Sequence, residues 1–377
     1  MPRFTIRILC IIAIFTFPSL AETQRWSEAK ANEWYAQQPW LIGANYVPAT
    51  AVNQLEMWQA ETFDPPQIDK ELGWAEDAGM NMMRIFLSYV LWDKEPEAFR
   101  QRIDIFLTIA AKHQIRTMFV LFDSCFDPRP KLGPQHPPIP GVHNSAWVQS
   151  PGAAALEDSS RYGHLRAYVQ GVVSAFANDR RVLTWDIWNE PNNIFPPYEK
   201  FEPEDKVRLE QKLLPQVFAW ARSANPTQPL TSGLWQDGDW SSTDKLNLTE
   251  RIQLEQSDVL SFHNYSWPED WEHHVEWLER YHRPIICTEF MARALGNTFD
   301  TILPLAKKHN IGVNAAALVY GKVQSYLPWD SWEHPYILDQ PPVWFHDIFY
   351  PDGRPYRPAE IMLIRKLTGR GIPPGSQ

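Results

Sequence analysis

The sequence predicts an α/β protein, a single (β/α)8 (TIM) barrel with long loops after strands three and eight. Short apolar runs alternate with helical patterns along nearly the whole chain, and eight such runs are present. These runs are apolar throughout and do not alternate with polar residues, which is typical of parallel strands covered on both faces. Polar side chains follow several of the runs, as they do at the carboxyl-terminal face of such a barrel.

The predicted elements follow one another in order, beginning with a helix at 25–39. The expected strands occupy residues 41–48, 82–87, 117–123, 182–190, 229–235, 259–265, 284–290 and 313–320. Apolar side chains recur at helical spacing between them, which predicts helices at 66–78, 99–110, 165–176, 204–223, 269–282, 298–309 and 358–368. The alternative is an open, doubly wound sheet, which needs a glycine-rich turn after the first strand. This chain has no such turn.

Two connections are much longer than a barrel requires. Residues 124–157 contain seven prolines, and residues 323–347 contain Trp329, Trp332 and Trp344. Because they follow strands three and eight, both are expected at the carboxyl-terminal face, where long loops are more often functional than idle. No internal repeat or flexible linker interrupts the pattern, so residues 22–377 are predicted to form one domain.

The first 21 residues are expected to be a secretory signal peptide. Arg3 and Arg7 precede an apolar run at 8–17, and Ser19-Leu20-Ala21 fits a small-x-small cleavage site. A run of about 10 apolar residues is too short to cross roughly 30 Å of hydrocarbon, so a membrane span is not predicted. The expected location is therefore secreted or periplasmic.

Charge and composition narrow the class of partner. The net charge is -10, and loss of Arg3 and Arg7 would leave -12, so the surface offers no attraction for nucleic acid or anionic lipid.

Cys125 and Cys287 are the cysteines beyond residue 21 and form no CxxC pair, so neither a metal site nor a cofactor is expected. Aromatic residues make up 13% of the chain, and flat rings in polar stretches suit stacking on sugars. The expected partner is an oligosaccharide or polysaccharide. The oligomeric state is not predicted.

Two glutamates are the main candidates for chemistry. Glu190 ends the fourth strand and Glu289 lies near the end of the seventh, so a closed barrel directs both toward one cavity. Two convergent carboxylates are the minimum for glycoside cleavage, because one protonates the leaving oxygen while the other attacks the anomeric carbon. A single glutamate more often caps a helix or pairs with a base, but that explanation is harder to sustain for both.

The alternative function is a non-catalytic, carbohydrate-binding protein on the same barrel. The abundance of tryptophan favours it, but binding alone gives no reason to keep both Glu190 and Glu289. Carboxyl groups more than about 9 Å apart would favour binding, or an inverting enzyme, over a retaining one.

Several motifs together resemble the retaining glycosidases of the clan that includes glycoside hydrolase family 5. They are Arg84 on strand two, Asn189-Glu190-Pro191 on strand four, His263-x-Tyr265 on strand six and Thr288-Glu289-Phe290 on strand seven. The resemblance covers nearly all of residues 22–377. It implies the barrel fold and retaining hydrolysis of β-linked oligo- or polysaccharides, of the β-mannoside or β-glucan type.

The resemblance also implies roles for individual residues. Glu190 matches the acid/base and Glu289 the nucleophile of the family. Asn189 matches the residue that hydrogen-bonds the sugar 2-hydroxyl, an interaction that strengthens in the transition state.

Three further residues match groups that surround this pair. Arg84 and Tyr265 correspond to residues that keep the nucleophile ionised and oriented, and His263 to a histidine near the acid/base. A cation beside Glu289 is expected to lower the pKa of that carboxyl group.

The chain departs from the family at two positions. Family 5 usually has a histidine just after strand three, where this chain has Asp123-Ser124-Cys125. The usual strand-eight tryptophan has no counterpart unless Trp329 or Trp332 reaches in from the following loop. Sugar stacking is expected of four tryptophans, namely Trp235, Trp240, Trp329 and Trp332.

Overall fold

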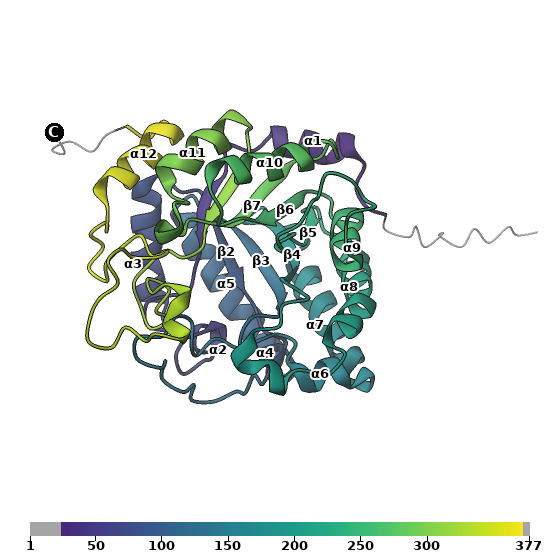
Figure 1. Cartoon of the computed structure of the whole chain (residues 1–377). Helices are drawn as coiled ribbons and strands as arrows, with labels where there is room; N and C mark the ends of the chain where they lie inside the picture. The colour runs from purple at the N-terminus through teal and green to yellow at the C-terminus, as the bar shows by residue number, and fades with distance from the viewer. Residues whose placement is uncertain (1–23, 372–377) are drawn as a thin grey trace, which may run out of the picture.

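Eight parallel strands form the centre of the computed structural model, which describes residues 24–371 (Figure 1). The predicted signal peptide at 1–21 lies outside the described residues. The order across the sheet is β5-β4-β3-β2-β1-β8-β7-β6. The strands are β1 Ile42–Asn45, β2 Met82–Phe86, β3 Arg116–Asp123, β4 Val182–Asn189, β5 Leu230–Thr231, β6 Leu260–His263, β7 Ile285–Phe290 and β8 Gly312–Ala315.

The two ends of this order, β5 and β6, meet through the segment that follows β5. Leu234 forms a parallel bridge with Phe262. The Leu234 amide donates to the carbonyl oxygen of Ser261 at 3.0 Å, and the His263 amide donates to that of Leu234 at 2.8 Å. The prediction of a (β/α)8 barrel is therefore confirmed.

Strands β5 and β8 end well before their predicted ends, and the chain pairs elsewhere beyond them. The ladder between β4 and β5 covers Leu230 and Thr231, because the chain then moves across to β6. Strand β8 ends at Ala315. Beyond it, Val319 pairs with Phe349 at the far end of the long loop. Apolar composition alone does not show where a buried segment changes its pairing partner.

The helices pack around the outside of the strands (Figure 1). Every predicted helix is present: α1 Glu28–Ala36, α3 Pro65–Ala78, α5 Pro96–Lys112, α7 Tyr162–Phe176, α8 Lys206–Ser223, α10 Pro268–Glu279, α11 Phe299–Lys308 and α12 Pro358–Thr368. Four shorter ones were not predicted, namely α2 Gln54–Trp58, α4 Tyr89–Lys94, α6 Ala153–Glu157 and α9 Leu248–Gln256.

Helix α9 had a signal in the sequence. Asn247 accepts from the Glu250 amide at 3.0 Å, and the Glu250 carboxylate accepts from the Asn247 amide at 2.8 Å. This capping box is readable as Asn-x-x-Glu. Helices α2, α4 and α6 have five or six residues, too few for a helical periodicity to be detected.

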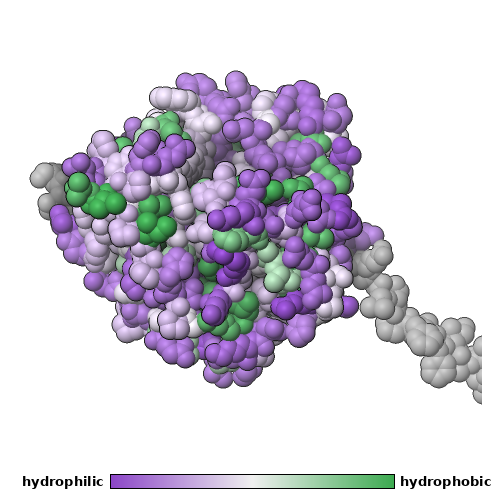
Figure 2. Space-filling view, turned by 60° about the horizontal axis from the view of Figure 1, so that its bottom comes forward, coloured by the Kyte–Doolittle hydropathy of each residue, from purple (hydrophilic) through white to green (hydrophobic). Residues whose placement is uncertain are grey.

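The apolar core fills the space between strands and helices. Trp58, Trp185, Trp188 and Trp271 are fully buried there, so part of the high tryptophan content serves packing. On the face shown in Figure 2, hydrophilic residues predominate and hydrophobic ones form separate small groups. Within residues 24–371, no helix is long and apolar enough to span a bilayer.

The close approach of β1 to β2 gives a test of the barrel packing. A Cβ at Gly43 would lie 1.8 Å from the Met82 carbonyl oxygen, which belongs to backbone and cannot move aside. We expect Gly43→Ala to lower the free energy of unfolding by about 3 kcal/mol or more. In the matched control Gly163→Ala, the new methyl group meets nothing within 4 Å. This change inside helix α7 should stabilise by about 0.5–1 kcal/mol. Denaturant unfolding measures both, and equal stabilities would contradict the packing argument.

Candidate active site

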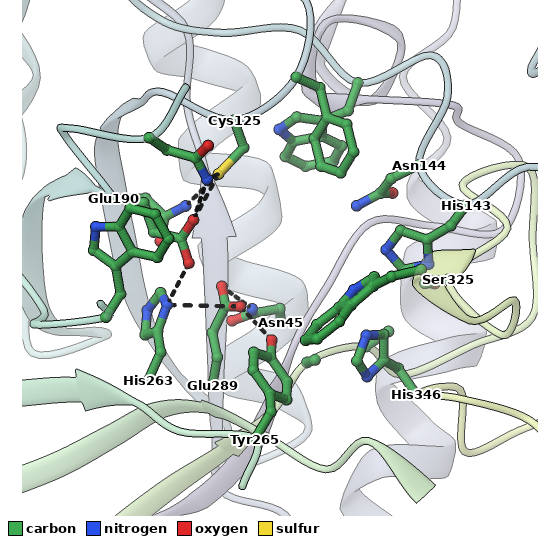
Figure 3. Close-up of a pocket in the computed structure, with 18 of the residues that line it drawn as sticks. Asn45, Cys125, His143, Asn144, Glu190, His263, Tyr265, Glu289, Ser325 and His346 are labelled. Atoms are coloured by element: carbon green, nitrogen blue, oxygen red, sulfur yellow. Dashed lines mark hydrogen bonds and ion pairs between the residues drawn. The ribbon is translucent and has the colours of Figure 1, made fainter. Parts of the chain in front are cut away.

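A cavity of about 1150 Å³ opens at the carboxyl ends of the strands (Figure 3). Glu190 follows β4 and Glu289 lies in β7, and both side chains line the cavity. Glu190, His263 and Glu289 each bring one side-chain atom to within 4.8 Å of the other two. The barrel therefore brings together two carboxylates that are 99 residues apart in the sequence.

Glu190 is held in an unusual backbone conformation. Its φ of +46° lies in the left-handed region, which residues other than glycine rarely adopt and which is common at functional sites. Its Oε2 accepts from Asn193 Nδ2 at 2.6 Å and from Cys125 Sγ at 3.2 Å. Its Oε1 lies 2.8 Å from His263 Nδ1. The carboxyl group is thus oriented on both oxygens.

Glu289 has a different set of neighbours. Arg84 Nη1 and Asn45 Nδ2 donate to its Oε1 at 2.8 and 2.9 Å, and the Tyr265 hydroxyl donates to its Oε2 at 2.5 Å. Burial by itself raises the pKa of Glu289, but His263, Arg84 and Tyr265 outweigh this effect and hold the pKa below its ordinary value. Burial and the adjacent Glu289 raise the pKa of Tyr265, so its hydroxyl stays protonated and remains a donor.

Arg84 lies behind the cavity and does not line it. The side chain is fully buried, and its Nε and Nη2 donate to Asp186 Oδ2 at 2.9 and 2.8 Å. The resemblance implied that Arg84 orients the Glu289 carboxylate, and the structure places it as a partner of Glu289, Asp186 and Asn189.

The same guanidinium orients Asn189. Arg84 Nη2 donates to Asn189 Oδ1 at 2.7 Å, and Asn189 Nδ2 donates to Asp123 Oδ1 at 2.8 Å. Because a guanidinium only donates and a carboxylate accepts, the amide has one possible orientation. Asn189 lines the cavity with its nitrogen on the side of Asp123.

Asp123 ends β3, beside the position where glycoside hydrolase family 5 usually has a histidine. It also accepts from Trp147 Nε1 at 2.6 Å, and Trp147 belongs to the long loop after β3. Burial raises the pKa of Asp123 to about 6 despite the hydrogen bonds from Asn189 and Trp147, and the nearby Glu190 carboxylate adds to the rise. Asp123 therefore links the loop to the amide of Asn189.

Four of these contact residues were not among the predicted site residues. Asp123 ends an apolar run, as Asn189 does, so its position carried a signal, whereas Asn45 lies inside the predicted strand 41–48 and ends β1 only in the structure. Cys125 and Asn193 lie in loops, and their contact with the Glu190 carboxylate depends on how those loops fold.

Three of the predicted tryptophans line the cavity, namely Trp235, Trp329 and Trp332. Trp329 is 43% exposed, and its ring stands edge-on to Tyr265 at 5.1 Å between centroids. It therefore reaches the neighbourhood of Glu289 from the loop after β8. Trp332 packs more deeply, with its ring 5.0 Å from that of Phe195.

The prediction for Trp240 is wrong. Its ring is buried and packs against His274 and Phe262, at 4.4 and 6.3 Å between centroids. Trp267 was not predicted, yet it is 65% exposed and lines the cavity. Sequence context does not distinguish a tryptophan that packs under a loop from one that faces a cavity.

The trio Glu190, His263 and Glu289 has the spacing of metal ligands. Both oxygens of Glu289 already accept hydrogen bonds from Arg84, Asn45 and Tyr265. A cation at this point would face the Arg84 guanidinium, which favours an acid/base function over metal binding.

Comparisons with known proteins identify the fold. No protein-family model matches the chain, and none of the curated proteins matches its sequence. Among solved structures, it is similar to the exo-β-1,4-mannosidase of Opitutaceae bacterium strain TAV5, with 16% identity and a TM-score of 0.57 over 88% of this chain and 60% of that one.

This chain aligns with nearly the full length of other similar structures. The glycoside hydrolase family 5 mannosidase of Rhizomucor miehei has 15% identity and a TM-score of 0.54 over 88% of this chain and 93% of that one. The endo-1,4-β-D-mannanase of Thermotoga petrophila RKU-1 has 13% identity and a TM-score of 0.53 over 88% and 99%. The fold implied by the sequence resemblance to family 5 is therefore confirmed.

The buried charges of the site can be tested without any assay of activity. Arg84→Met would leave the Asp186 and Glu289 carboxylates without their guanidinium, so we expect a loss of about 3–5 kcal/mol in unfolding free energy at neutral pH. Arg100→Met, which breaks the exposed pair with Glu97, should change the stability little.

The loss of unfolding free energy in Arg84→Met should depend on pH. A lowered pKa in the folded state means that Glu289 stabilises the protein above the ordinary carboxyl pKa, and that this contribution disappears as the pH falls through the lowered value. In Arg84→Met the lowering is weakened, so the difference from the wild type should be full near pH 7 and should shrink as the pH falls below about 4.5 toward the lowered pKa of Glu289. A difference that stays constant would contradict this account of Glu289.

Proposed function

We propose that this protein is a retaining glycoside hydrolase that acts on β-linked oligo- or polysaccharides, with β-mannosides favoured over β-glucans. The observation that carries the proposal is the approach of one carboxylate oxygen of Glu190 to one of Glu289, within 4.8 Å. Retaining enzymes hold their two carboxyl groups about 5–5.5 Å apart, whereas inverting enzymes need about 6.5–9.5 Å to admit a water molecule. The preference for mannosides rests on the similar structures, which are mannosidases and mannanases by name.

The first step forms a covalent intermediate. Glu190 protonates the glycosidic oxygen while the Glu289 carboxylate attacks the anomeric carbon, so that the bond to the leaving group breaks as the ester bond forms. Arg84, Asn45 and Tyr265 support this role, because they orient the Glu289 oxygens and Arg84 favours their ionised form.

The second step releases the sugar. Glu190, now a carboxylate, takes a proton from water, and the oxygen of that water attacks the anomeric carbon and breaks the bond to Glu289. Hydrogen bonds from Asn193 and Cys125 to Glu190 stabilise the carboxylate in this step. Two displacements at one carbon preserve its configuration.

The proposed substrate also suits the proposed location. A secreted enzyme can reach a polysaccharide outside the cell, and residues 1–21 have the pattern of a secretory signal. We therefore propose a secreted or periplasmic enzyme.

The assigned roles predict different behaviour of two variants. Glu190→Ala should lower kcat by at least about 100-fold, the range of general acid–base catalysis. Glu289→Ala should lose more, because the covalent route is closed. Azide should restore turnover in both, giving a glycosyl azide of retained configuration with Glu190→Ala and of inverted configuration with Glu289→Ala.

Proton NMR of the products on an aryl β-mannoside measures both the rate and the configuration. The matched control is Glu199→Ala, which removes an exposed carboxylate that does not line the cavity and should keep full activity. Near-normal hydrolysis by either variant, or inversion by the unaltered protein, would rule out the proposed mechanism.

A further inference from the structure

The two sides of Glu289 in the cavity differ. Glu190, Cys125 and His263 lie on one side of it, whereas His143, Asn144, Ser325 and His346 lie on the other (Figure 3). Under the proposed function, the leaving group lies toward the acid Glu190, and the sugar that is attacked lies toward Glu289. We call the residues His143, Asn144, Ser325 and His346 the end wall, because they face the sugar that becomes attached to the enzyme.

The end wall is built where the two long loops join. The backbone amide of Asn144 donates to the Val323 carbonyl oxygen at 3.1 Å, and the backbone amide of His143 donates to Ser331 Oγ at 2.9 Å. Gln324 Nε2 donates to the carbonyl oxygens of Ile139 and Val142, both at 2.8 Å. The loops after β3 and β8 therefore form one connected barrier at this side of the cavity.

The two histidines of the wall have a defined tautomer. His143 Nδ1 lies 2.7 Å from the Leu327 carbonyl oxygen, and His346 Nδ1 lies 2.6 Å from that of Met291. A carbonyl oxygen only accepts, so each Nδ1 carries the hydrogen. Burial lowers the pKa of His143 to about 4 and that of His346 to about 3, so both rings are neutral near pH 7. Each Nε2 then has a free lone pair.

These lone pairs have no donor within the described part of the chain. Both rings are 3% exposed, line the cavity and lie 5.5 Å apart between centroids. Asn144 Oδ1 is also buried without a hydrogen-bond partner there. Ser325 donates its hydrogen to Asp347 Oδ1 at 2.6 Å and so offers its oxygen as an acceptor. The end wall is uncharged and offers several unused acceptors beside the side-chain amide of Asn144, which suits a neutral ligand whose hydroxyl groups both donate and accept.

We infer that the enzyme removes one neutral hexosyl residue at a time from the non-reducing end of its substrate, and that the Nε2 atoms of His143 and His346 accept hydrogen bonds from the hydroxyl groups of that residue. The inference rests on the proposed function. An acidic sugar is disfavoured because the four residues of the end wall offer no cation to pair with its carboxylate.

The direction of cleavage can be read from a labelled oligosaccharide. With β-1,4-mannopentaose labelled at its reducing end with 2-aminobenzamide, we expect the labelled tetrasaccharide as the first product, with free mannose in equal amount. A labelled disaccharide or trisaccharide as the first product would overturn the inference but keep the proposed function. If the protein hydrolyses neither the mannopentaose, nor the corresponding β-glucan oligosaccharide, nor aryl β-glycosides, the result counts against the proposed function itself.

The histidine contacts can be tested with 4-nitrophenyl β-mannoside and its 3-, 4- and 6-deoxy analogues. We expect at least one analogue to react about tenfold more slowly in kcat/KM than the parent, as loss of one hydrogen bond implies. His143→Phe or His346→Phe should lose a similar factor on the parent and no longer discriminate against that analogue. His346→Gln, which keeps an acceptor near the place of Nε2, should keep more of the discrimination.

The matched control is His136→Phe. His136 belongs to the same loop and also has its Nδ1 against a carbonyl oxygen, but it is exposed and does not line the cavity. The His136→Phe variant should keep the rate of the wild type and its discrimination against the deoxy analogues. If the variants of His143 and His346 lose rate but still discriminate against every deoxy analogue as the wild type does, the histidines do not contact the sugar and the inference is wrong.

Discussion

One buried guanidinium holds the candidate site together. Arg84 on β2 donates hydrogen bonds to Asp186 on β4 and Glu289 on β7, so one guanidinium connects three strands of the barrel. A buried cation is tolerated because two carboxylates face it. The same contacts keep Glu289 ionised and set the amide of Asn189 in one orientation. The chemistry at the cavity floor therefore depends on an arrangement that the core of the barrel also needs.

The two glutamates differ because their surroundings differ. Glu289 faces a permanent cation and two further donors. Glu190 has no such cation, and Asn193, Cys125 and His263 surround it. A nucleophile must stay ionised, whereas an acid/base must gain and lose a proton in each cycle. The left-handed backbone of Glu190 comes directly after the last residue of β4, at the point where the chain leaves the strand.

Under the proposed function, chemistry and substrate choice are assigned to different parts of the fold. The residues around the two glutamates come from strand ends, which the barrel positions rigidly. The end wall comes from the two long loops, which hold each other through hydrogen bonds of Asn144 and Gln324. Loops of this kind change length and content while the barrel is kept, so similar barrels cleave the ends or the middle of a chain. Asp123 connects the two parts, since it binds both Asn189 and the loop residue Trp147.

The order of strands and helices and the placing of Glu190 and Glu289 at strand ends could be predicted from the sequence alone, because burial of parallel strands leaves a pattern of local apolar runs. The identity of Arg84 as the partner of Glu289 came from a motif resemblance. The contacts of Asn45, Cys125 and Asn193, the burial of Trp240 and the pairing of His143 with His346 were decided only by the tertiary structure. Except for Asn193, which lies three residues from Glu190, each of these joins segments far apart in the chain, and no local pattern encodes the distance between two loops.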